Sequence, residues 1–309
     1  MGSTAGQSVT PGHATTTRPG VWLTDASLVL MALIWGVNFS VVKFGTSLVD
    51  PLAYNGLRVS LAAVLLFAIV AAGRLVLPSR RDMLALLALG VLGNGIYQYF
   101  FVMGVARTRA SDAALVIAAT PAFIATIGAI RGTERTSTRG VLGIVMSIIG
   151  IGLVVLGTST GASGEASILG DLLVLCGSLA WAIYTVMLKP FTARVPGIQL
   201  SAFTMLGGAI SLLAVAAPHV ASVDWTHFPV RGWLAVLYSG VGALVVAYYF
   251  WYRGVRVIGP TRTAMYSNLQ PIIAVLVAWA MLGEQPTIWQ CVGAGSIMGG
   301  LLLTRTRNT

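Results

Sequence analysis

Long apolar segments set the main constraint on what this chain can fold into. Ten of them recur from end to end, and each has about 20 residues with few charges, enough to cross a hydrocarbon layer roughly 30 Å thick as a helix. The composition agrees, because 56% of the residues are hydrophobic and 9% are charged, with a mean hydropathy of +0.85. The sequence therefore predicts an all-α polytopic membrane protein. Its expected transmembrane helices cover residues 25–43, 51–73, 83–106, 110–130, 140–156, 169–188, 197–217, 232–252, 260–282 and 287–303.

The segments between these helices are short, so we expect no soluble domain. Residues 1–24 are rich in Gly, Ser, Thr and Pro, a composition that predicts a disordered N-terminal tail. This tail has neither the basic start nor the small-residue cleavage site of a signal peptide.

The basic residues indicate the orientation of the chain rather than an acidic partner. The formal net charge is +10, but Lys and Arg lie at alternate ends of the apolar segments. Fourteen of the 19 fall on the side of the N-terminus, Arg58 lies within a segment, and the other side has only Lys43, Arg107, Arg109 and Arg231. Because cytoplasmic loops are enriched in Lys and Arg, we expect both termini in the cytoplasm. The expected location is the cell (inner or plasma) membrane, within the lipid bilayer and with no nucleic-acid partner.

Side chains for metal binding or hydrolysis are not grouped in this sequence. Cys176 and Cys291 fall inside predicted helices, and His13, His219 and His227 lie outside them. We therefore expect no metal site and no cofactor. The motifs HExxH and Walker A are absent, so the sequence does not indicate a zinc hydrolase or an ATP-driven pump.

An internal repeat organises the chain. The phrase "PAFIATIGAIRGTE" at residues 121–134 recurs as "PIIAVLVAWAMLGE" at residues 271–284, an offset of 150, and glycines at 90, 104, 143 and 150 recur at 240, 254, 293 and 300. At an offset of 146, Asp25 pairs with Asp171 and Trp35 with Trp181. Two five-helix units, residues 25–157 and 168–305, are thus predicted. Because five is odd, the second unit enters the membrane from the opposite face, as in secondary transporters with inverted repeats.

The segments "ALIWGVNFSVVKFG" and "GSLAWAIYTVMLKP" open the two units, and the repeated phrase with its following glycines closes them. In these features the chain resembles the drug/metabolite transporter superfamily with two EamA-type halves, over nearly all of the sequence from Asp25 to Arg305. The resemblance implies ten helices and transport of a small-molecule substrate. The bacterial amino-acid exporters are the subgroup that it most looks like, which implies export of amino acids, of aromatic or broad range, or of related metabolites.

Polar and aromatic residues within the helices are the candidates for substrate binding, since such groups need a cavity or a partner inside a membrane. Several share helix faces at spacings of three or four, and they lie on matching helices of both units. The alternative is that they are ordinary interhelical contacts, and the aromatics at 251 and 252 also fit an interfacial belt. The cavity candidates are Trp35, Asn38, Asn94, Tyr97, Gln98, Trp181, Tyr184, Tyr248, Tyr266 and Gln270.

Arg58 is a further candidate with two interpretations. It either extends to the nearby membrane surface or faces the cavity and attracts a carboxylate. Pro121 and Pro271 are expected to interrupt the fourth and ninth helices, as symmetry-related hinges or as static kinks. Glu134 and Glu284 end these helices and are expected to be structural.

Small residues on the fifth and tenth helices, including the GxxxG at Gly295 and Gly299, predict close packing within the chain or in a homodimer.

All nine acidic residues lie in loops or near predicted helix ends. A proton-coupled carrier usually has a titratable group deep in its helices. We therefore expect a facilitator that works by alternating access. A proton-coupled drug/metabolite antiporter is the alternative, followed by a channel or an intramembrane enzyme.

Overall fold

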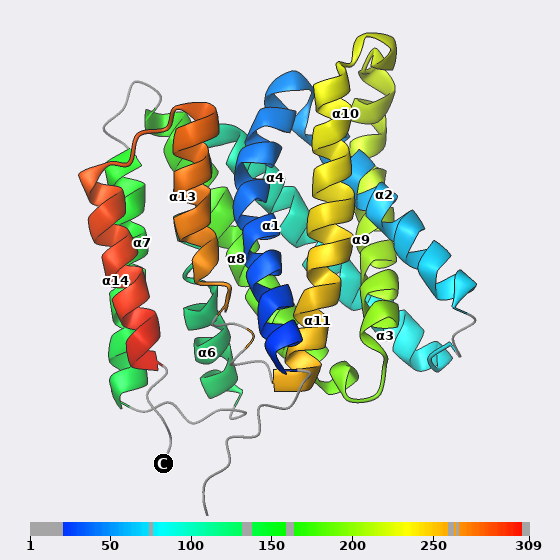
Figure 1. Cartoon of the computed structure of the whole chain (residues 1–309), viewed down its shortest axis with the longest axis horizontal. Coiled ribbons are helices and arrows are strands. Elements are labelled where there is room, and N and C mark those ends of the chain that lie inside the picture. Colours follow the sequence, from blue (N-terminus) through cyan, green and yellow to red (C-terminus); the bar gives the residue numbers. More distant parts are fainter. Residues whose placement is uncertain are drawn as a thin grey trace, which may run out of the picture.

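The computed structural model describes residues 21–73, 77–131, 138–158, 164–258, 263 and 266–304, and every regular element within these ranges is a helix (Figure 1). The first unit contains α1 (Val21–Leu48), α2 (Pro51–Ala72), α3 (Arg80–Gly90), η1 (Val91–Ile96), α4 (Tyr97–Arg107), α5 (Ala110–Ile117), α6 (Thr120–Ile130) and α7 (Thr138–Thr158). The second contains α8 (Gly164–Thr192), α9 (Gly197–Ser222), η2 (Trp225–His227), α10 (Val230–Leu237), η3 (Tyr238–Val246), α11 (Ala247–Ile258), α13 (Leu269–Leu282) and α14 (Ile288–Thr304).

Eight helical spans of the described chain are long and apolar enough to cross a membrane by length and composition. They match the first eight predicted segments, with the third, fourth and eighth built from consecutive helical pieces. α13 and α14, with 14 and 17 residues, correspond to the ninth and tenth segments. Residues 260–262, at the start of the ninth segment, lie outside the described residues. The predicted fold class, an all-α polytopic membrane protein, is confirmed.

The N-terminal helix is longer than predicted. α1 begins at Val21, within the stretch predicted as a disordered tail, and residues 1–20 lie outside the described residues. Trp22 is 63% exposed and Leu23 46% exposed on this first turn. Tryptophan is favoured at the membrane interface, and this preference fits an exposed tryptophan on the first turn of the helix. The predicted helix did not include these residues because Pro19 and Gly20, directly before α1, are typical of irregular chain.

Two π-helical segments occur at equivalent places in the two units. η1 covers residues 91–96 and η3 covers residues 238–246, so the segments overlap when the 150-residue offset is applied. A π-helix has hydrogen bonds from residue i to i+5 and is often found at functional sites. Sequence periodicity did not predict either segment.

The fourth and ninth spans are interrupted near their prolines. α5 ends at Ile117 and α6 starts at Thr120, one residue before Pro121. Because proline lacks an N–H, the Ile117 carbonyl has no donor four residues later, and the Thr120 hydroxyl donates to it at 2.6 Å instead. Before Pro271, the equivalent Ser267 carbonyl accepts the Gln270 N–H at 3.1 Å. At each break, the carbonyl that the proline cannot hydrogen-bond accepts another donor instead.

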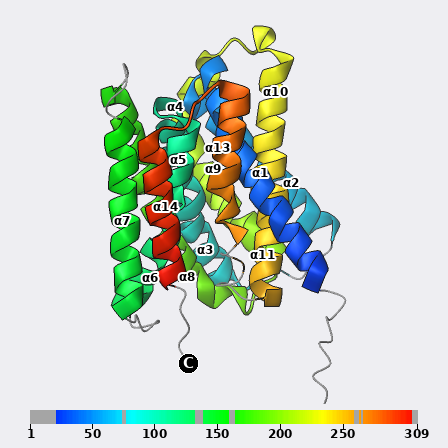
Figure 2. The same cartoon turned by 60° about the vertical axis from the view of Figure 1, so that its left-hand side comes forward.

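Contacts between glycines relate α7 to α14 by an approximate two-fold axis. The backbones approach too closely for a side chain at these glycines. A Cβ atom added to Gly150 would lie only 2.8 Å from the Gly293 carbonyl oxygen, and one added to Gly300 only 2.4 Å from the Gly143 carbonyl oxygen. In the repeat, Gly143 pairs with Gly293 and Gly150 with Gly300, so each contact becomes the other when the units are exchanged. The two helices therefore run antiparallel, side by side at one edge of the bundle (Figure 2).

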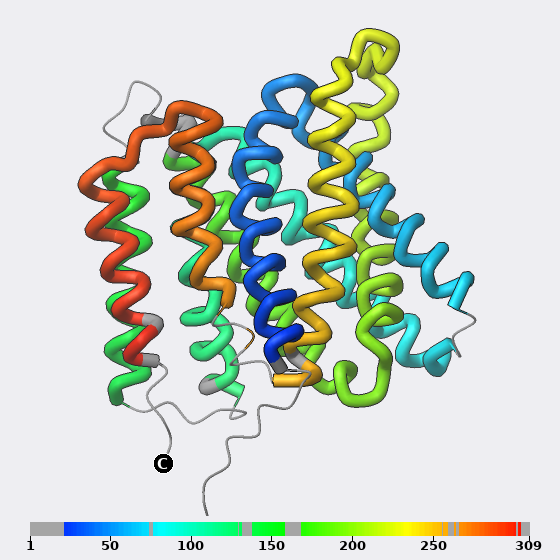
Figure 3. The backbone as a smooth tube through the Cα atoms, in the orientation of Figure 1, coloured from blue at the N-terminus to red at the C-terminus, as the bar shows by residue number. Residues whose placement is uncertain are grey.

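The same exchange relates the helices nearer the centre. A Cβ on Gly104 of α4 would lie 2.6 Å from the Val174 side chain of α8, and a Cβ on Gly254 of α11 would lie 2.7 Å from the Leu28 side chain of α1. Gly104 pairs with Gly254 at the offset of 150, and Leu28 with Val174 at the offset of 146. The start of α1 and the end of α14 lie on the same side of the molecule (Figure 3).

The GxxxG pair on α14 is only partly used inside the chain. A Cβ on Gly299 would lie 3.2 Å from the Met146 side chain, whereas a Cβ on Gly295 would meet nothing within 4 Å. The close packing of α14 onto α7 therefore depends on Gly293 and Gly300 instead.

Candidate functional site

A cavity lies among helices of both units. It contains about 950 Å³ of space, including space open to solvent. α1, α2, α4, α5, α6, α8, α11 and α13, together with η3 and the break before α13, contribute to its wall. The predicted residues in this wall are Trp35, Asn38, Arg58, Tyr97, Gln98, Pro121, Trp181, Tyr248, Gln270 and Pro271.

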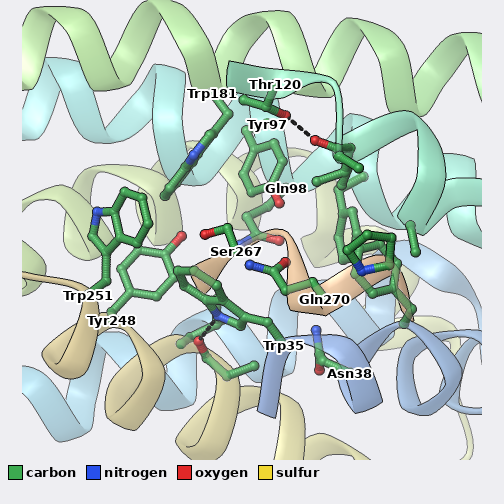
Figure 4. Close-up of a pocket in the computed structure, with 18 of the residues that line it drawn as sticks. Trp35, Asn38, Tyr97, Gln98, Thr120, Trp181, Tyr248, Trp251, Ser267 and Gln270 are labelled. Carbon is green, nitrogen blue, oxygen red and sulfur yellow. Dashed lines mark hydrogen bonds between the residues drawn. The ribbon is translucent and has the colours of Figure 1, made fainter. Parts of the chain in front are cut away.

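Aromatic rings form one side of the cavity (Figure 4). The Trp35 ring centroid lies 5.8 Å from that of Tyr248 and 5.8 Å from that of Trp251. The Trp181 centroid lies 5.0 Å from that of Tyr97 and 5.7 Å from that of Tyr248. The rings come from both units, and each makes an edge or tilted contact of the kind that aromatic pairs prefer.

The first ring is also anchored by a hydrogen bond. The Trp35 indole N–H donates to the Ala243 carbonyl oxygen at 2.9 Å. Ala243 lies in η3. One side chain of the first unit is thus attached to the π-helical segment of the second unit.

Amide and hydroxyl groups from separate elements face the same space. Figure 4 shows Gln98, Ser267 and Gln270 directed toward the middle of the cavity. Asn38 has its amide oxygen occupied, since it accepts the Ser239 hydroxyl at 2.9 Å. The cavity therefore has hydrogen-bonding groups opposite its aromatic side.

Arg58 is completely buried, in the cavity wall. Its Nε donates to the Asn55 amide oxygen at 2.9 Å, and its Nη2 donates to the Gln98 amide oxygen. Its guanidinium carbon lies 5.7 Å from the Phe101 ring centroid. This geometry does not fit an arginine that extends to the membrane surface.

Three predicted cavity residues lie outside the wall. Asn94 is fully buried behind it and accepts the Tyr248 hydroxyl at 3.3 Å, while Tyr184 bonds to the Tyr252 hydroxyl at 3.0 Å. Tyr266 donates to Asp25 at 2.7 Å. Asn94 was predicted on the face of Tyr97 from α-helical spacing, but it lies in η1, where the wider turn changes the side-chain direction.

Other residues line the cavity although the sequence analysis did not select them. Thr120 and Ser267 stand beside the two breaks, and Trp251 was set aside as a possible interfacial aromatic. One feature of the sequence could have identified Thr120 and Ser267 as lining residues, since each is a small polar residue close to a helix-breaking proline. Helix faces assigned from regular spacing did not include these two residues, because the helical spacing is interrupted at each break.

On one side of the cavity, the end of α13 closes onto the start of α5. The Glu284 carboxylate accepts the Ala110 N–H at 2.9 Å, the Ser111 N–H at 3.0 Å and the Ser111 hydroxyl at 2.7 Å. Arg109 donates to the Gln285 carbonyl oxygen at 2.6 Å. We call these five residues the α5–α13 seam. Glu284 thus caps the N-terminus of a helix in the other unit, a favourable position for a carboxylate.

Gly283 directs Glu284 into the seam. It has φ of 69°, the left-handed conformation that ends α13 and that favours glycine. Gln270, at the other end of α13, lines the cavity, and the 14 residues from there to Glu284 correspond to about 20 Å along a helix. The seam therefore lies to one side of the cavity, one turn of α5 away from Ala114 in the cavity wall. The equivalent Glu134 lies outside the described residues.

Within the described residues, no group of three or more His, Cys, Asp or Glu side chains could hold a metal ion. The side chains of the cavity can instead bind and orient a small organic molecule.

Comparisons with known proteins agree with this architecture. The profile of the EamA-like transporter family matches residues 22–156 and again residues 168–306. The uncharacterized transporter YyaM of Bacillus subtilis (strain 168) is 26% identical, covering 89% of this chain and 91% of that protein. The uncharacterized inner membrane transporter YedA of Escherichia coli (strain K12) is 27% identical, covering 90% of this chain and 89% of that protein.

A third relative is the probable terminal-alkyne amino-acid exporter of Streptantibioticus cattleyicolor, which is 26% identical over 91% of this chain and 93% of that protein. A solved crystal structure has the same fold, with a TM-score of 0.63 and 22% identity over 91% of this chain and 98% of that chain.

A helical membrane bundle of two related units around a shared cavity is found in many secondary transporters. The chain belongs to the EamA-like transporter family, within the drug/metabolite transporter superfamily. It is a multi-pass membrane protein that acts as a transporter and not as an enzyme.

Proposed function

We propose that this protein is a secondary transporter that exports amino acids, of aromatic or broad range, or similar small metabolites by alternating access. The observation that carries this proposal is the cavity, with its aromatic side and its opposite amide groups contributed by both units. Aromatic rings and a few placed polar groups are typical of sites for small organic molecules. The amino-acid exporter among the relatives supports the same substrate class.

The inverted repeat supports alternating access. Because the contacts of one unit recur with the units exchanged, a movement that opens one side has a symmetry-related movement that opens the other. The α5–α13 seam is a set of contacts that must separate when its side opens. Pro121 and Pro271 border the breaks in the two spans, and we assign them the role of hinges.

We propose facilitated movement of the substrate without stoichiometric proton coupling. No Asp, Glu or His occurs in the described lining of the cavity. A proton carried with the substrate would need such a group in contact with the cavity.

Proton-coupled antiport is the second candidate, and two buried carboxylates favour it. Asp112 is 1% exposed and accepts the Gln290 side-chain N–H at 2.6 Å. Asp171 is fully buried and accepts the Thr108 hydroxyl at 2.6 Å. Both lie outside the cavity wall, so the facilitator remains the preferred mechanism.

Flux through purified full-length protein in proteoliposomes tests both candidates. A panel of labelled L-amino acids is followed with the membrane voltage clamped. We expect saturable flux and counterflow, with exchange against unlabelled substrate on the opposite side. A pH gradient of either sign is expected to leave the equilibrium distribution of a net-neutral amino acid unchanged.

Two results would change the proposal. Accumulation that follows the pH gradient and collapses with a protonophore would establish the antiporter, and loss of coupling in Asp112→Asn or Asp171→Asn would identify the carboxylate. Flux that does not saturate and shows no counterflow would indicate a channel instead.

A further inference from the structure

We propose that the Arg58 guanidinium binds a carboxylate of the substrate, so that the cavity selects amphipathic carboxylates over cations that lack this group. The inference rests on the proposed transport function and deepens it by naming the chemical group that the cavity recognises. It comes from a buried cation whose Nη1 has no hydrogen-bond partner, in a cavity whose described lining contains no acidic residue.

Arg58 has an unused donor. Its Nε and Nη2 are bonded to Asn55 and Gln98, but its Nη1 is buried and has no hydrogen-bond partner. Arg58 is not part of any ion pair among the residues that the structure describes. Buried charges in proteins are normally paired, because an unpaired charge away from water is costly. A substrate anion would supply the missing partner.

The chemistry of the open position fits a carboxylate. The guanidinium is planar and always charged, and its parallel N–H groups match the two oxygens of a carboxylate. Its two present partners, Asn55 and Gln98, are neutral amides, which orient the group without neutralising its charge. Asn55 is itself held, since its amide N–H donates to the Gln98 carbonyl oxygen at 2.9 Å. The cation is therefore positioned before the substrate arrives.

The backbone beneath Arg58 is also confined. A Cβ on Gly240 of η3 would lie 3.0 Å from the Arg58 carbonyl oxygen, so α2 packs closely on the second unit at this point. This close packing fixes the position of the backbone from which the Arg58 side chain extends.

The charge of the wall determines which substrates are disfavoured. Arg58 is the one charged residue in the described lining. A substrate with a carboxylate gains a counter-ion there, whereas an organic cation meets a like charge without a compensating acid. The aromatic rings of Trp35, Tyr248 and Trp251 remain available for the apolar part of the substrate and, through their faces, for an ammonium group.

Three probes of similar size separate these contributions. L-Phenylalanine carries both charged groups, 3-phenylpropionate lacks the ammonium, and L-phenylalaninamide lacks the carboxylate. Their binding to the purified full-length protein is read from tryptophan fluorescence, since Trp35, Trp181 and Trp251 line the cavity. We expect both carboxylates to bind wild-type protein at least about tenfold more tightly than the amide, from the strength of a charged hydrogen bond.

Substitutions at two positions test the assignment. In Arg58→Gln, phenylalanine and its amide are expected to bind with about equal affinity. Arg58→Lys is expected to keep a weaker preference for the carboxylate, because lysine retains the positive charge without the planar guanidinium. Gln98→Glu places a carboxylate beside Arg58, so the preference should fall although Arg58 is present. Arg231→Gln is the matched control, because Arg231 is exposed and packs over Phe44, outside the cavity wall. Size-exclusion profiles and melting temperatures verify that each variant is folded.

The outcomes separate this inference from the proposed function. The Arg58 assignment is overturned if Arg58→Gln and Gln98→Glu keep the wild-type preference for carboxylates. It is also overturned if the wild-type protein binds neither carboxylate better than the amide. Both conclusions hold even where amino-acid flux is observed. If 3-phenylpropionate binding depends on Arg58 but no amino acid is transported, the carboxylate site stands and the amino-acid function fails.

Discussion

Trp35 illustrates how one residue joins the two units at the cavity. Its indole N–H is bonded to Ala243, and its ring contacts those of Tyr248 and Trp251. Removal of the ring would take away one part of the wall and the indole donor to the Ala243 carbonyl of η3. The neighbouring rings would then lose their edge contacts.

We predict that Trp35→Ala and Tyr248→Ala lower the initial rate of amino-acid counterflow by about tenfold, which corresponds to roughly 1.4 kcal/mol of lost interaction. Trp35→Phe retains a ring without the N–H, so its counterflow rate is expected to lie between those of the wild type and Trp35→Ala. Leu302→Ala is the control, because Leu302 is 62% exposed on α14. Equal effects at the cavity and control positions would show that these rings do not contact the substrate.

At the scale of elements, the bundle depends on close approaches between helices of different units. α7 packs on α14 through glycines, and α13 closes onto α5 through Glu284. The first contact joins whole helices over their length. The second joins a helix end to a helix start, so it can separate without loss of the helices themselves.

Two glycines on α7 provide a matched pair. A Cβ on Gly150 would lie 2.8 Å from the Gly293 carbonyl oxygen, whereas a Cβ on Gly152 would meet nothing within 4 Å. Gly150→Ala should destabilise the protein by about 1–3 kcal/mol through overpacking. Gly152→Ala should be neutral or stabilise it by up to about 1 kcal/mol, from helix propensity. Melting temperatures in detergent measure both, and equal shifts would contradict the assigned packing.

Glu284→Ala is predicted to weaken the α5–α13 seam. Each hydrogen bond to its carboxylate is worth about 1.5–3 kcal/mol, so the ratio of closed to open molecules should fall by at least about tenfold. An Ala114→Cys probe in the cavity wall, with Cys176 and Cys291 replaced by Ser, measures access of an impermeant thiol reagent in intact cells. We expect faster labelling in Glu284→Ala and an intermediate rate in Glu284→Gln.

Asp82→Asn is the control for this experiment, since it removes a salt bridge to Arg194 that is partly exposed and outside the seam. If Asp82→Asn and Glu284→Ala change the labelling rate equally, the seam does not control access to the cavity.

At the scale of the whole molecule, the inverted repeat and the distribution of basic residues determine the proposed orientation. The start of α1, the end of α14 and the turn after α8 lie on one side in Figure 1, and η2 lies on the other. The proposed cytoplasmic termini therefore require that η2 face outward.

Single cysteines in a background without Cys176 and Cys291 test this orientation. His227→Cys in η2 should react with an impermeant reagent in intact cells, because His227 is exposed. Ala193→Cys, exposed in the turn after α8, should react only after permeabilisation. The opposite pattern would reverse the proposed topology.

Much of the fold was predictable because it depends on local composition. Apolar length predicts a membrane helix wherever backbone groups must be satisfied internally, and the recurrence of Pro121 as Pro271 reveals the duplicated unit. The predicted start of the first helix, Asp25, lies four residues after the observed start of α1 at Val21, because apolar periodicity does not fix where a helix begins. η1 and η3 were missed, because a π-helical turn is selected by packing rather than by the pattern of apolar residues.

The sequence by itself determined the class of protein: apolar segments, an odd-numbered repeat and the positions of basic residues are properties of the chain read in order. Only the tertiary structure decided which polar residues meet. Asn94 and Tyr97 are three residues apart, yet the π-helical turn leaves one behind the wall and the other in it. The role of Glu284 at the start of α5 likewise depends on two helix ends more than 170 residues apart. Such contacts follow from how the units pack, because each spacing along a helix allows several faces and only packing selects one.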